Sequence, residues 1–177
     1  MIRFALTLFL IYTMTNRLLL FDFNAHTPVN SWQIVDDGVM GGRSAGNFYI
    51  NAQGHAVFEG KVSLENNGGF SSVRHGFDTK RIEGYTKMLI RLKGDGKRYQ
   101  LRVKSSLTDS YSYVAYFSTQ QDWQSVEVKL SEMYPTFRGQ RLNRPNYPAQ
   151  SLSEIAFLIG NGSAESFQLI IDKIELQ

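Results

Sequence analysis

GKVSLENNGGFSSVRHGF, from Gly60 to Phe77, is the most informative stretch of this chain. It contains two runs of alternating residues, Lys61–Glu65 and Phe70–His75, and a period of two is typical of β-strands. Two asparagines and two glycines, residues 66–69, separate the runs. Because Asn and Gly tolerate the positive φ angles of a tight turn, we predict a β-hairpin here.

The second run places Phe70, Ser72 and Arg74 on one face of a strand. An aromatic ring beside a guanidinium group suits a surface that recognises another molecule. The alternative is an ordinary hairpin whose arginine is solvated on an outer face.

The composition of the 177 residues favours one domain made of strands. Apolar residues make up 42% of the chain, enough for a core, and the 12 Phe and 9 Tyr favour strands over helices. Roughly ten to twelve strand-like runs are joined by short Gly, Asn or Asp turns. We therefore predict an all-β fold, a two-sheet antiparallel β-sandwich or jelly roll. The last strand, Glu165–Leu176, is expected to pair with the first, Leu18–Phe23.

Several classes of chemistry find no support in the sequence. The chain has no Cys, which excludes disulfides and thiol catalysis, and a net charge of +3 without a Lys/Arg run does not indicate nucleic acid binding. The three His residues are scattered, and no Ser lies in a nucleophile motif. Gly94-Asp95-Gly96 resembles part of a nucleotide-binding motif, but we predict a hairpin turn there. We expect a non-enzyme without a cofactor.

The N-terminal residues Met1–Thr13 combine one Arg with an apolar run, as secretory signals do. This predicts an exported or periplasmic protein, although no A-x-A-like cleavage site follows. The alternative is translation from Met14, which would leave the protein in the cytoplasm. In both cases we treat residues 1–17 as an extension and residues 18–177 as the single domain. The apolar run is too short to span a bilayer. We expect membrane contact only through this extension, if the mature protein retains it.

Two loops carry residues that suit chemistry or binding. Asp36 and Asp37 form a carboxylate pair that could serve acid/base work, but we favour a structural role in which one caps the turn at Gly38 and the other faces water. Gly41-Gly42-Arg43-Ser44 resembles an anion-binding turn, and the alternative is a close-packed turn.

A basic face is the strongest candidate for binding. Alternation places five basic residues opposite the apolar faces of their strands, and we expect them to share one sheet face. They are Arg74, Arg91, Lys93, Arg102 and Lys104, with Tyr111, Tyr113 and Trp123 as aromatic neighbours. Such a face can stack on sugar rings or hold a polypeptide and its acidic groups. The alternative is an ordinary solvated sheet face.

Two long motifs carry a resemblance to a known family. They are W-x-x-V-D-D-G-V-M-G-G-R-S, from Trp32 to Ser44, and F-x-G-x-V-S-L-E-N-N-G-G-F-S-S-V-R, from Phe58 to Arg74. The chain resembles the complex I intermediate-associated protein 30 family. The resemblance implies a galactose-binding-like jelly roll related to non-catalytic carbohydrate-binding modules, a fold that often carries a structural calcium ion, although no Asp-rich loop here matches a calcium pattern. Mitochondrial members act as assembly factors for respiratory complex I. Because residues 1–17 lack a mitochondrial-type presequence, we expect a bacterial protein.

The resulting hypothesis is a chaperone-like module that binds a protein partner, of the kind linked to assembly of NADH:ubiquinone oxidoreductase. The alternative is a module that binds a glycan on the concave sheet face, which requires exposed Tyr or Trp rings there. The residues expected to bind the partner or the glycan are Asp37, Arg43, Asn66, Asn67, Phe70, Arg74, Arg91, Arg102 and Tyr113.

Overall fold

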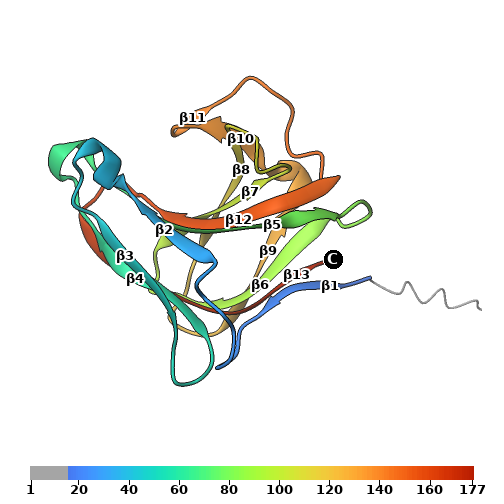
Figure 1. The fold of residues 1–177 in the computed structure, drawn as a ribbon, viewed down its shortest axis with the longest axis horizontal. Helices are drawn as coiled ribbons and strands as arrows, with labels where there is room; N and C mark the ends of the chain where they lie inside the picture. Colours follow the sequence, from blue (N-terminus) through green and yellow to red (C-terminus); the bar gives the residue numbers. More distant parts are fainter. Residues whose placement is uncertain (1–15) are drawn as a thin grey trace, which may run out of the picture.

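Two antiparallel sheets make up the part of the chain that the structure, a computed structural model, describes, residues 16–177 (Figure 1). The six-stranded sheet contains β1 (Leu18–Asp22), β3 (Ala45–Ile50), β4 (Ala56–Val62), β6 (Lys87–Lys93), β9 (Gln124–Lys129) and β13 (Glu165–Leu176). Its order is β3-β4-β13-β6-β9, and β1 also pairs with β13. The predicted pairing of the first strand with the last is therefore confirmed.

The seven-stranded sheet has the order β11-β10-β8-β7-β12-β5-β2. Its strands are β2 (Trp32–Asp36), β5 (Ser71–Arg81), β7 (Arg98–Lys104), β8 (Ser112–Ser118), β10 (Tyr134–Phe137), β11 (Gln140–Arg141) and β12 (Ser151–Ile159). Three short 3-10 helices, η1 (Asp37–Met40), η2 (Glu65–Asn67) and η3 (Leu130–Glu132), lie in connections. The all-β sandwich predicted from composition is confirmed.

The core lies between the two sheets and is rich in aromatic residues. Phe58 from the six-stranded sheet and Tyr99 and Phe157 from the seven-stranded sheet are completely buried. Burial of each such side chain contributes roughly 2 kcal/mol to folding. Successive side chains of a strand point to opposite faces of its sheet, so one face packs against this core and the other faces away from it.

The stretch from Gly60 to Phe77 does not form the predicted hairpin. β4 pairs with β3 and β13, whereas β5 pairs with β2 and β12, so residues 63–70 cross from one sheet to the other. The turn residues behave as expected, since Asn66 and Asn67 have φ angles of 54° and 60°. The hairpin prediction was wrong because alternation identifies strands without identifying their partners.

Gly94-Asp95-Gly96 connects the sheets in the same way. It follows β6 in the six-stranded sheet and precedes β7 in the seven-stranded sheet, so the hairpin turn predicted there is also wrong.

The predicted export signal and the alternative start at Met14 lie outside the described residues, so both stay predictions. Within residues 16–177, the structure contains no helix long and apolar enough to cross a membrane.

Candidate functional site

The seven-stranded sheet has a face that points away from the core, here called the outer face. Its central row crosses five strands: Arg74 lies opposite Ala156, Ala156 opposite Arg102, Arg102 opposite Val114, and Val114 opposite Tyr134. A second row, two residues along, places Gln100 opposite Tyr116. The two rows bring together residues that are far apart in the sequence.

The middle of the outer face is sheltered although its side chains point away from the core. Val114 and Ala156 are only 1% and 4% exposed. In Figure 1 the β10–β11 end of the sheet rises above β12, on the side opposite the six-stranded sheet. Strands that curve in this way shelter the centre of a face, so the outer face is concave.

Arg102 is the central polar residue of the outer face. Its guanidinium donates hydrogen bonds to Gln100 Oε1 (2.9 Å) and to Thr136 Oγ1 (3.2 Å), and Gln100 Nε2 donates to the Tyr116 hydroxyl (3.2 Å). Burial lowers the pKa of Arg102, although Tyr116 and Glu154 oppose this shift. The guanidinium is thus partly removed from water, and its hydrogen-bond acceptors in the protein are neutral groups.

Two tyrosines lie beside this network, each with an arginine over its ring. Arg98 lies over Tyr116 and Arg141 over Tyr134, both with the guanidinium carbon 4.6 Å from the ring centre. Tyr116 is 45% exposed. Tyr134 is more buried, and this burial, together with the neighbouring Tyr116, raises its pKa. Cation–π contacts of this kind hold the guanidinium groups at the surface of the sheet.

Asp37 joins the loop before β3 to the crossing between the sheets. Asp37 is 5% exposed and accepts hydrogen bonds from Gly69 N (2.6 Å), Phe70 N (3.3 Å), and the backbone and hydroxyl of Ser44. We call these four residues the Asp37 cluster. Burial alone raises the pKa of Asp37, but the hydrogen bonds outweigh it, so the pKa lies below its ordinary value.

The expectation that one of the two carboxylates caps the Gly38 turn and the other faces water was wrong. Asp36 accepts hydrogen bonds from Gly46 N (3.0 Å) and from the hydroxyl of Ser71 (2.6 Å), so it too ties separate segments together. These donors belong to β3 and β5, strands of different sheets that lie far apart in the sequence. Both carboxylates hold the fold together.

The other expected loop residues also contact each other. Arg43 forms an exposed ion pair with Glu65 (2.9 Å), and Asn66 Nδ2 donates to the carbonyl oxygen of Gly41 (2.8 Å). Asn67 is exposed, and Phe70, which precedes β5, is partly buried. These contacts agree with the close-packed turn rather than with an open anion-binding turn.

The basic residues expected on one face lie on two sheets. Arg74, Arg102 and Lys104 belong to the seven-stranded sheet, whereas Arg91 and Lys93 are on β6 of the six-stranded sheet. Arg91 Nε forms an ion pair with Asp172 (3.0 Å). The single-face prediction was wrong because alternation gives the side of a strand but not the sheet to which the strand belongs.

The three aromatic residues expected beside the basic face differ in burial and in position. Tyr113 is 7% exposed and packs against Tyr147 on the core side, and Tyr111 is partly buried. Trp123 is 38% exposed but contacts Arg91 and His55 of the six-stranded sheet. The glycan alternative would fail if all three of these residues were buried. Trp123 is exposed, so this alternative stays open.

Sequence reasoning missed the two tyrosines of the outer face. Alternation along Ser112–Ser118 places Tyr116 on the side opposite Tyr113, which was a usable signal. Tyr134 offered none, because it begins a stretch with three of the four prolines and no regular alternation.

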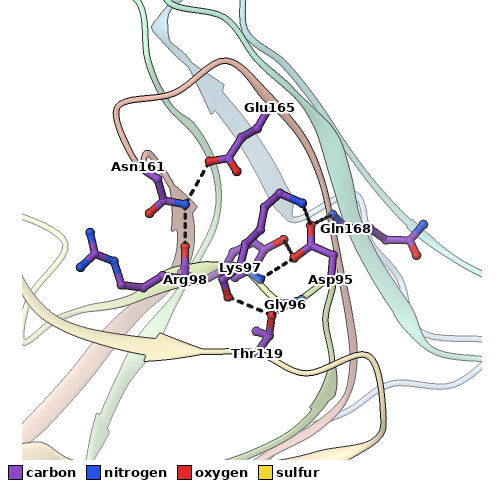
Figure 2. Close-up of polar contacts among 9 residues, drawn as sticks. Asp95, Gly96, Lys97, Arg98, Thr119, Asn161, Glu165 and Gln168 are labelled. Atoms are coloured by element: carbon purple, nitrogen blue, oxygen red, sulfur yellow. Dashed lines mark hydrogen bonds and ion pairs between the residues drawn. The ribbon is translucent and has the colours of Figure 1, made fainter.

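A second polar cluster, shown in Figure 2, surrounds the loop between β6 and β7. Asp95 accepts hydrogen bonds from Lys97 Nζ (2.9 Å), the Tyr99 hydroxyl (3.1 Å) and Gln168 N (3.0 Å). Burial is the main cause that raises the pKa of Tyr99 far above its ordinary value, with Asp95 adding to it. The cluster attaches this crossing to β13 and has a structural role.

No three His, Asp or Glu side chains come together as a metal site within residues 16–177. The structural calcium ion considered from the resemblance is therefore not supported by such a cluster and stays untested.

The fold is similar to solved carbohydrate-binding modules at low sequence identity. The family 11 module of a cellulosomal cellulase from Clostridium thermocellum has a TM-score of 0.68 at 12% identity, covering 91% of this chain and 94% of that one. The same module with a β-1,3-1,4-mixed-linked tetrasaccharide gives 0.66 at 13% identity, covering 90% and 94%. A family 29 module gives 0.52 at 11%, covering 92% and 91%.

The comparison with family models identifies the family directly. No curated protein matches the chain significantly. The model of the complex I intermediate-associated protein 30 family matches residues 21–171, which is most of the chain. The chain therefore belongs to the complex I intermediate-associated protein 30 family.

Proposed function

We propose that this protein is a non-catalytic binding module that holds a polypeptide partner on its outer face, as an assembly factor for respiratory complex I would. Membership of the complex I intermediate-associated protein 30 family supports the link to complex I assembly. The partner would be a subunit or an assembly intermediate of that complex.

The observation that carries the proposal is the composition of the outer face. It combines Tyr116 and Tyr134 with Arg98, Arg102 and Arg141 on a concave surface. Tyrosine and arginine are the residues that most often dominate the binding energy of protein interfaces. Their side chains are already held in place by contacts with each other, which lowers the entropy lost on binding.

Glycan recognition is the second candidate, and one observation favours it. Tyr116 is exposed on a concave sheet face, and exposed rings are what sugars stack on. Solved modules with a similar fold are carbohydrate-binding modules, one of them in complex with a tetrasaccharide. Against it, Arg98 already lies over the ring of Tyr116.

The test is affinity capture from native extract with the full-length chain, followed by mass spectrometry. The outer-face variant is Arg74→Ala/Arg102→Gln. The matched control is Lys61→Ala/Lys129→Ala, which removes the same charge from exposed positions of the six-stranded sheet. We expect complex I subunits with the parent and the control, and not with the outer-face variant.

Absence of complex I subunits from the parent, or equal capture by the outer-face variant, would contradict the proposal. Binding of neutral oligosaccharides that the same variant abolishes would favour the glycan candidate instead.

A further inference from the structure

Arg102 is a partly buried cation of the outer face. Within residues 16–177 its guanidinium makes hydrogen bonds only to the neutral side chains of Gln100 and Thr136, and it forms no ion pair. An arginine carries more N–H donors than these two bonds use. A charge removed from water is costly unless an opposite charge or a full set of hydrogen bonds compensates it. The Arg102 guanidinium therefore has N–H donors left for an anionic acceptor, although the charge of Glu154 also acts on it.

Ala156 separates Arg74 from Arg102 on the outer face, and it is only 4% exposed. This small residue is opposite Arg74 on one side and opposite Arg102 on the other. Neighbouring strands are about 4.8 Å apart, so the backbones of the two arginines are about 10 Å apart. The Arg102 guanidinium reaches Thr136 on β10, so it extends away from Ala156 and Arg74. Arg74 is exposed and makes no hydrogen bond or ion pair within the described residues. The two guanidinium groups are therefore separate positions, and each could donate hydrogen bonds to a different carboxylate.

The surrounding charges favour an anion as well. The outer face also carries Arg98, Lys104 and Arg141, against one central acid, Glu154. Glu154 is 3.9 Å from Lys104 Nζ, so its charge is shared with that lysine. The face is therefore basic after its internal ion pair is counted.

The arrangement suits an extended polypeptide better than a sugar. Three basic side chains of β7 lie on the outer face, separated by four and two residues along the strand: Arg98, Arg102 and Lys104. Side chains on one side of an extended peptide recur at the same step of two residues, roughly 7 Å. Arg98 and Arg141 lie over ring faces on which a sugar would stack.

We infer that the outer face binds a segment of acidic polypeptide, with its carboxylates bound at separate positions by Arg102 and by Arg74. The inference rests on the proposed function, because it names the part of a protein partner that this face recognises.

The test is fluorescence anisotropy with the full-length chain and a labelled peptide in which three glutamates alternate with threonines. The control peptide carries glutamine in place of each glutamate. We expect binding of the acidic peptide only, weakened at least tenfold by Arg102→Met and by Arg74→Ala, and less than twofold by Lys61→Ala. Circular dichroism verifies that each variant is folded.

Three results would overturn the inference: equal binding of the glutamine peptide, equal binding by Arg102→Met, or binding of oligogalacturonate without binding of the acidic peptide. Failure here is distinguishable from failure of the proposed function. If extract capture still recovers complex I subunits in an Arg102-dependent manner, the protein-binding proposal stands and only the acidic segment is wrong.

Discussion

Asp37 is buried and Arg102 is partly buried, and the pKa values of both charged residues are lowered, with opposite meanings. For Asp37 the lowered pKa means that the fold stabilises the charged form, through hydrogen bonds from Ser44, Gly69 and Phe70. For Arg102 the lowered pKa means that burial disfavours the charged form. The protein itself satisfies the charge of Asp37, whereas Arg102 keeps N–H donors that we propose are used for an external anion. The loops around Asp37 therefore hold the fold together, and the outer face is the proposed binding surface.

The largest effect on stability is expected from Asp37→Ala. The variant leaves several buried donors of Ser44, Gly69 and Phe70 without their acceptor, which costs about 3 kcal/mol or more. Urea denaturation measures the free energy of unfolding. The control is Asp22→Ala at an exposed position, with an expected change below about 0.5 kcal/mol. A loss below about 1 kcal/mol for Asp37→Ala would contradict a structural role for the Asp37 cluster.

A smaller loss, of about 2 kcal/mol, is expected from Gly68→Ala. A Cβ atom there would lie 2.6 Å from Asp37 Oδ2 and 2.9 Å from the Ser63 carbonyl oxygen. Gly42→Ala is expected to act in the same way, because its Cβ would collide with Asp37 Oδ1. Gly38→Ala is the matched control, since nothing lies within 4 Å of its Cβ. Equal denaturation midpoints for Gly38→Ala and Gly68→Ala would show that close packing on Asp37 does not explain these glycines.

The pH dependence of stability sharpens the comparison further. Because the pKa of Asp37 is lower in the folded state, its contribution is fully present above the unfolded-state value of about 4 and is lost as pH falls through the folded value. We expect the free energy of unfolding of Asp37→Asn to fall less steeply below pH about 4 than that of the parent. Equal slopes of the free energy of unfolding against pH for the parent and Asp37→Asn would mean that ionisation of Asp37 does not stabilise the fold.

The smallest effect on stability is expected from Arg102→Met. Replacing a partly buried charge that has only neutral hydrogen-bond partners by an apolar side chain of similar length is expected to change the free energy of unfolding by less than about 0.5 kcal/mol or to raise it. Thermal and urea denaturation of the same variant used for the binding test give this value. A loss above about 2 kcal/mol would mean that Arg102 supports the fold in the way that Asp37 does.

The fold class could be read from the sequence, because alternation and turn residues are local signals. Asn66 and Asn67 adopt the positive φ angles expected of them, and β1 pairs with β13 as expected. The sheet to which each strand belongs could not be read, because strand partners are chosen by packing between distant segments. For this reason the hairpin predicted from Gly60 to Phe77 was wrong.

The site was harder to anticipate than the fold. The most distinctive motifs, around Asp37 and around Asn66, turned out to contact each other across more than 30 residues. Arg74 and Arg102 were selected correctly as members of one face, but Arg91 was not. Tyr134 escaped notice because local pattern is weak next to proline.

The most direct measurement is an NMR titration of the parent chain with the alternating glutamate peptide, following backbone amides and arginine side-chain signals. We expect shifts to concentrate at Arg74, Ala156 and Arg102 on the outer face, while the amides of Ser44 and Gly69 in the Asp37 cluster stay unchanged. Shifts concentrated in the Asp37 cluster, or no shifts on the outer face, would contradict the division between a region that builds the fold and a region that binds.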